Sequence, residues 1–160
     1  MHKADNTIVR SLYRMTWNRW NSVSEGAAVF KGRDSYTVMG PAGTPVTPED
    51  KVTRDYYGLA VNFTPTKYQI FPGADLSVPI SWSQGLSGNS AVLLGGNEGA
   101  GSYSVGVAID LQSRYRFDLK YVDFLGGTTT NAANMITSSG GANSLLTDRG
   151  FVVFTFKTTL

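Results

Sequence analysis

The stretch SYSVGVAIDLQSRYRFDLKYVDF, residues 102–124, alternates apolar with small or polar side chains in two runs, which the short segment LQSR, residues 111–114, separates. In the first run the apolar positions are Tyr103, Val105, Val107 and Ile109, and in the second they are Tyr115, Phe117, Leu119 and Tyr121. Successive side chains of a strand point to opposite faces, so each run predicts a strand with one apolar face. The stretch therefore predicts a β-hairpin.

The register of this hairpin follows from the same pattern. Keeping both apolar faces on one side pairs Val107 with Leu119, and places Gly106 opposite Lys120 and Ala108 opposite Asp118. A slip by one residue would turn every apolar side chain of one strand to the opposite face.

Similar alternation recurs along the chain and predicts an all-β fold. Strands are expected near residues 57–64, 76–83, 102–110, 115–123 and 151–160. A weaker pattern covers Val9 to Asn18, where an amphipathic helix through Ile8, Leu12 and Met15 is the rival reading; Thr, Tyr and Trp favour the strand. We expect an antiparallel up-and-down meander of about six strands, with no helix longer than roughly three turns. As part of a transmembrane β-barrel, it would be open or incompletely closed if alone.

Composition limits the functional classes. The 160 residues suit one domain, 1–160, and the formal net charge of +2 gives no reason to expect a nucleic-acid partner. The chain has no Cys and a single histidine, His2, so no cysteine nucleophile, catalytic triad or cysteine metal site can be assembled. We expect no enzymatic activity, no cofactor and no metal. Only 16% of the residues are charged, against roughly 25% in ordinary soluble domains.

The two faces of the predicted strands favour a lipid environment. Opposite the apolar positions lie mostly Gly, Ala, Ser, Thr and Asn, which suit an enclosed wall better than a face open to water. The expected lipid-facing residues are Leu59, Val61, Phe63, Val78, Ile80, Trp82, Val105, Val107, Phe117, Leu119, Tyr121, Phe154 and Phe156. The expected lumen-lining residues are Arg14, Asn62, Asp110, Arg116, Asp118, Lys120 and Lys157. Aromatic residues expected to mark the lipid boundary are Tyr57, Trp82, Tyr103, Tyr121, Phe124 and Phe151.

The connections alternate in length, as they do in outer-membrane barrels. Residues 66–74 and 111–114 are predicted to be short periplasmic turns, and residues 21–54, 84–101 and 125–149 long external loops. This orientation places Leu160 on the periplasmic side. No apolar run is long enough for a membrane helix, and the opening MHKADNTIVR does not look like a secretory signal.

Several long segments resemble a proteobacterial outer-membrane, porin-like family known as domain of unknown function 1302. They are residues 12–26, 29–36, 58–92, 95–124 and 147–160, including GLAVNFTPTKYQIFPGADLSVPISWSQGLSGNSAV and TDRGFVVFTFKTTL. The resemblance implies the C-terminal portion of a longer Gram-negative outer-membrane barrel, with a signal peptide and further N-terminal strands outside this sequence. It also implies membrane lipid and the barrel assembly machinery as partners. Phe154, Phe156 and Leu160 are the candidate assembly signal, although the family usually ends on an aromatic residue.

Two alternatives to a channel segment stay open. One is a soluble β-sandwich binding module, and the other is a small barrel that several copies complete. The charges also have two readings. Asp118 could simply neutralise the neighbouring bases, or Arg116, Lys120 and Lys157 could leave a positive wall that favours anionic solutes. The channel reading includes passive solute passage or a structural role in the membrane.

Overall fold

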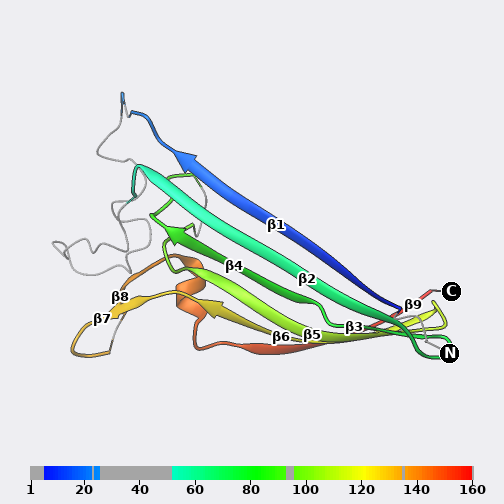
Figure 1. The fold of residues 1–160 in the computed structure, drawn as a ribbon. Coiled ribbons are helices and arrows are strands. Elements are labelled where there is room, and N and C mark those ends of the chain that lie inside the picture. The colour runs from blue at the N-terminus through cyan, green and yellow to red at the C-terminus, as the bar shows by residue number, and fades with distance from the viewer. Residues whose placement is uncertain (1–5, 23, 26–51, 93–95, 135, 160) are drawn as a thin grey trace.

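The computed structural model describes residues 6–22, 24–25, 52–92, 96–134 and 136–159, and nearly all of the regular structure in these ranges is antiparallel sheet (Figure 1). The main-sheet strands are β1 (Thr7–Arg19), β2 (Asp55–Phe71), β3 (Ala74–Ser77), β4 (Ile80–Ser87), β5 (Gly101–Leu111), β6 (Tyr115–Leu125) and β9 (Phe151–Thr158). A small hairpin of β7 (Thr128–Thr130) and β8 (Ile136–Ser139) and a 3₁₀ helix, η3 (Ala142–Leu146), lie between β6 and β9 in the chain. The rival helix at the N-terminal end is not formed, because β1 is a strand over its whole length.

The strands β3 and β4 act as one strand interrupted at Pro79. Ser77 and Ser81 pair with Ala108 and Ser104 of β5, so the register is continuous across the break. Proline has no N–H to donate to a ladder. Its carbonyl still accepts from the N–H of Gly106 at 2.9 Å. The main sheet is therefore a six-strand meander, in the order β1, β2, β3 with β4, β5, β6 and β9, as the alternation predicts.

The predicted hairpin register is confirmed. Val107 pairs with Leu119, Gly106 with Lys120 and Ala108 with Asp118. The strands β1 and β9 are the two edges of the main sheet. Over the described residues, the sheet does not close into a barrel.

Short and long connections lie at opposite ends of the sheet (Figure 1). The strand β2 extends to Phe71, so Pro72 and Gly73 alone join it to β3, and the turn is shorter than residues 66–74. At the β5–β6 turn three residues join the paired Leu111 and Tyr115, and two of them, Gln112 and Ser113, have left-handed φ of 52° and 54°. In Figure 1 the start of β1 and the end of β9 lie near these short turns, whereas β7, β8 and η3 lie at the far end.

Large hydrophobic side chains are mostly exposed in this sheet. Among the described residues, the buried hydrophobic ones are Tyr56, Ala74, Ala100 and Ala108. By contrast, Leu119 is 53% exposed, Phe154 65% and Met15 82%. The apolar side of the sheet therefore has no protein layer packed against it within the described part of the chain.

Two aromatic residues lie on the face opposite to the one expected. Phe124 is in register with Ser102, and Phe151 with Val122, so alternation places both with the small and charged residues. Their rings contact each other with centroids 6.2 Å apart. The expectation that Phe124 and Phe151 belong to the aromatic margin of the apolar face is wrong, because in each strand they differ in parity from residues such as Tyr121 and Phe154.

Candidate functional site

The cross-strand register gives the sheet two chemically distinct faces. One ladder runs through Arg14, Ala60, Ser83 and Ser102, from β1 to β5. We call the face that carries this ladder the inner face. A second ladder runs through Ile80, Val105, Tyr121 and Val152, from β4 to β9. The face that carries it is called the outer face.

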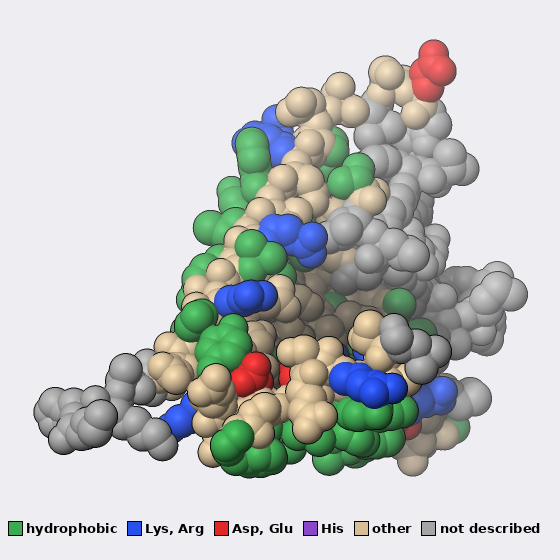
Figure 2. Space-filling view, turned by 90° about the vertical axis from the view of Figure 1, so that its right-hand side faces the viewer, with side chains coloured by type: hydrophobic (Ala, Val, Ile, Leu, Met, Phe, Trp, Pro, Cys, Tyr) green, Lys and Arg blue, Asp and Glu red, His purple; other side chains and the backbone are tan. Residues whose placement is uncertain are grey.

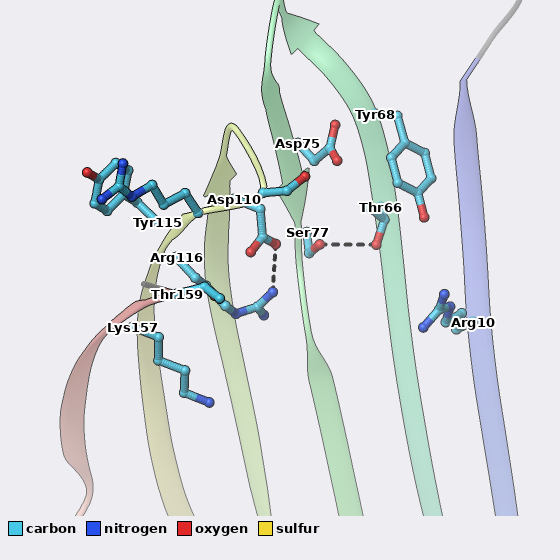
Figure 3. A pocket seen from close by; sticks show the side chains of 12 residues that line it. Arg10, Thr66, Tyr68, Asp75, Ser77, Asp110, Tyr115, Arg116, Lys157 and Thr159 are labelled. Atoms are coloured by element: carbon cyan, nitrogen blue, oxygen red, sulfur yellow. Dashed lines mark hydrogen bonds and ion pairs between the residues drawn. The ribbon is translucent and has the colours of Figure 1, made fainter.

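The inner face encloses a hollow of about 480 Å³ at the short-turn end (Figure 3). Its lining includes Arg10 from β1 and Lys157 from β9, which are the two edges of the sheet. A flat sheet could not bring its edges to one hollow, so the sheet curves with the inner face on the concave side. Figure 2 looks at the molecule from this end. It shows Lys and Arg side chains toward the middle of the view and hydrophobic side chains along its lower and left margins.

An ion-paired arginine lies at the centre of the charged wall. The Arg116 guanidinium is 2.7 Å from an Asp110 carboxylate oxygen and 3.6 Å from one of Asp118. Asp110 is the direct cross-strand partner of Arg116, whereas Asp118 is two residues further along the same strand and therefore on the same face. Arg116 is thus neutralised by two carboxylates that flank it.

Two lysines on the same face as Arg116 form no ion pair among the described residues. A smaller hollow of about 130 Å³ is lined by Lys120 and Lys157, together with Arg116, Asp118 and Thr155. Lys157 lies directly opposite Arg116, and like charges in that relation repel. Within the described ranges neither lysine has a carboxylate within ion-pairing distance. On strands β5, β6 and β9 the inner face therefore carries three bases and two acids.

The larger hollow is also lined by polar residues that were not predicted from the sequence as lining residues. Asp75 faces Asp110 directly across β3 and β5, and its carboxylate accepts a hydrogen bond of 2.8 Å from the backbone N–H of Gln69. Thr66 and Ser77 join their hydroxyls at 3.1 Å, as the dashed line in Figure 3 shows. Arg10 has the same parity as Arg14 along β1, and this signal was available in the sequence.

The outer face is formed by contacting aromatic and aliphatic groups. The Phe117 ring lies 5.0 Å from that of Phe156 and 6.5 Å from that of Phe154, measured between centroids. At the long-loop end, the hydroxyls of Tyr103 and Tyr121 both donate to one carboxylate oxygen of Asp123, at 3.0 and 2.9 Å. These two hydroxyls and the carboxylate form a polar cluster on the outer face at the long-loop end.

The residues expected to face lipid and those expected to line a lumen separate onto the two faces. The outer face carries Leu59, Val61, Phe63, Ile80, Trp82, Val105, Val107, Phe117, Leu119, Tyr121, Phe154 and Phe156. Val78 lies between β3 and β4 with the same parity as Ile80. The inner face carries Arg14, Asn62, Asp110, Arg116, Asp118, Lys120 and Lys157. Leu160 lies outside the described residues.

The described residues hold neither a metal-binding cluster nor a membrane-spanning helix. Over the described ranges, no group of three or more His, Asp or Glu side chains is placed to hold a metal ion. No helix in these ranges has the length and apolar character needed to cross a membrane.

One family model, described as "Protein of unknown function (DUF1302)", matches residues 12–160. No curated protein and no solved structure gives a significant match.

Proposed function

We propose that this chain, which belongs to the DUF1302 family of proteins of unknown function, forms part of the wall of a porin-like β-barrel in a bacterial outer membrane. The observation that carries the proposal is the separation of an exposed apolar outer face from a charged, concave inner face. In this role the outer face contacts lipid and the inner face lines a passage through which small solutes diffuse passively. The proposed role involves no catalysis.

The exposed apolar surface supports lipid rather than water as the neighbour of the outer face. Side chains such as Leu119, Phe154 and Phe156 adjoin one another across β6 and β9, and each is half exposed or more. Soluble monomers rarely expose contiguous apolar patches larger than about 300–600 Å². A soluble sandwich would cover this face with a second sheet, and no described residue does so. The absence of that second layer favours the barrel over the sandwich.

Strand length supports the same environment. The strands β5 and β6 contain 11 residues each. At about 3.3 Å per residue they are roughly 36 Å long, and a tilt of about 45° reduces their height to about 25 Å. This matches the apolar band of outer-membrane barrels, about 25 Å tall.

The two open edges indicate which partners are needed. Unpaired backbone groups cost several kcal/mol each in lipid, and about eight strands is the practical minimum for a membrane barrel. We therefore propose that further N-terminal strands of the family barrel pair with β1 and β9. Copies of this chain could also supply those strands, since both edges are open. We further propose that the barrel assembly machinery recognises the C-terminal strand through Phe154 and Phe156.

Membrane partition and channel measurements test this function. The protein should sediment with membranes, resist alkaline carbonate, dissolve in detergent and give discrete conductance steps in planar bilayers. Its size in detergent separates a barrel completed by further strands of one chain from one completed by several copies. A protein that stays monomeric in solution without detergent would refute the membrane assignment and favour the sandwich.

A further inference from the structure

The β4–β5 connection folds back over the inner face at the long-loop end of the sheet. Gly85 pairs with Gly58 on that face. A methyl group added at Gly85 would overlap the backbone carbonyl of Asn97, so this part of the connection lies directly above the strand. The bare surface of Gly85 is what allows the close approach.

Tyr56 completes this contact from β2. Its side chain is almost fully buried, with 4% of the residue exposed. An added methyl group at Gly58 would lie 2.6 Å from the Tyr56 hydroxyl, and one at Gly85 would lie 3.1 Å from the edge of its ring. Tyr56 and Asn97 therefore both cover the small-residue surface of β2 and β4.

Short hydrogen bonds tie the folded connection to the strands. The N–H of Gly85 donates to the carbonyl of Ala100 at 2.9 Å, and the N–H of Gly99 donates to the carbonyl of Gly85 at 2.8 Å. The Glu98 carboxylate accepts from the N–H of Gly88 at 2.8 Å. Residues 96–100 are thus anchored by their backbone as well as by packing.

The 3₁₀ helix η3 reaches the same place from the β6–β9 connection. A hollow of about 160 Å³ is lined by Asn143 of η3 and by Arg14, Ala60 and Ser83, which form one ladder on the inner face. Ser144 is buried, and its side chain occupies the space that a side chain at Gly126 would need. Two connections that are distant in sequence therefore cover the same end of the inner face.

We infer that residues 96–100 and η3 form a built-in constriction of the passage, with Arg14 and Asn143 facing the opening that remains. This inference rests on the proposed function, because only a channel has a passage to narrow. Arg14 offers a charged donor and Asn143 an amide, so the opening favours small solutes with carboxylate or hydroxyl acceptors over large apolar ones.

Glycine substitutions test the constriction with a matched control. Gly85→Ala forces residues 96–100 away from the strand, whereas an added methyl group at Gly127 meets no atom within 4 Å. In the completed barrel reconstituted in vesicles, Gly85→Ala should raise the permeation rate of the larger members of a sugar series several-fold, and Gly127→Ala should leave it unchanged. Asn143→Trp should act in the opposite direction and lower the permeation rate of the same sugars.

Hydrogen exchange tests whether residues 96–100 stay packed against β4, independently of any channel measurement. In detergent the amides of residues 85 and 99 should exchange slowly in the unmodified protein and faster in Gly85→Ala. If the unmodified protein conducts but both Gly85→Ala and Asn143→Trp permeate sugars at its rate, this inference is overturned while the channel stands. Fast exchange of both amides in the conducting protein also overturns the inference. If the unmodified protein does not conduct, the proposed function fails and the constriction fails with it.

Discussion

Replacing Leu119 by Arg distinguishes lipid from water as the neighbour of the outer face. Leu119 lies near the middle of β6, is 53% exposed, and pairs with Val107 and Phe154 on that face. An arginine facing the bilayer midplane costs about 2–4 kcal/mol, which corresponds to a roughly 30- to 700-fold smaller folding constant. At a solvent-exposed position of a soluble protein, the same kind of substitution usually changes stability by no more than about 0.5 kcal/mol.

The matched control for this substitution is Thr155→Arg. Thr155 lies on the inner face of the neighbouring strand, directly opposite Asp118, so a new guanidinium there remains in the hydrated passage. The Asp118 carboxylate offsets part of its repulsion from the three bases that line the same hollow. We expect the control to change the free energy of unfolding by less than about 1 kcal/mol. The assay is reversible denaturant unfolding of each variant folded in lipid vesicles, followed by tryptophan fluorescence. Equal free energies for the two variants, or a larger loss for Thr155→Arg, would refute the assignment of the faces.

Three further predictions concern the charged wall and the open edges. Lys120→Glu combined with Lys157→Glu changes the charge of the inner face by four units. At about 8 Å from a permeating ion, each unit contributes about 0.5 kcal/mol in water, and screening at 0.1 M salt leaves about 1 kcal/mol in total. The reversal potential of the channel under a salt gradient should therefore shift toward cation preference, and an unchanged value would leave both lysines a structural role only. Arg116→Gln removes the ion-pair partner of Asp110 and Asp118. Because all three side chains are partly exposed, the free energy of unfolding should fall by at most about 1 kcal/mol, as the denaturation midpoint will show. A much larger loss would contradict the partial exposure of these ion pairs. The isolated chain should aggregate or oligomerise through β1 and β9, as its sedimentation will show, and a monodisperse monomer at low micromolar concentration without detergent would contradict this.

The strands and their register could be predicted because they depend on local alternation. In the hairpin of residues 102–124, parity alone determines that Val107 meets Leu119, and the long periodic runs leave no competing register. In β1 the alternation is weaker, and the preference of Thr, Tyr and Trp for strands favoured a strand over an amphipathic helix. Alternation alone also predicts that one face carries Asp110, Arg116, Asp118, Lys120 and Lys157.

The features that the sequence left open depend on contacts between distant segments. The folding of residues 96–100 over Gly85 depends on the tertiary position of Tyr56, and no local pattern encodes that position. The predicted register already places Asp110 opposite Arg116, and the structure adds that the two side chains form an ion pair at 2.7 Å. The position of Phe124 and Phe151 was misjudged because aromatic character was given more weight than parity.

A cysteine scan of residues 116–121 tests the central claim most directly, because the protein contains no native cysteine. Each single-cysteine variant of the protein in lipid vesicles is labelled once with a fluorophore and assayed for quenching by brominated lipid, and once with a membrane-impermeant thiol reagent. The account predicts strong lipid quenching at Phe117, Leu119 and Tyr121, and reagent access at Arg116, Asp118 and Lys120. A reversed alternation, or access of the aqueous reagent to all six positions, would contradict it.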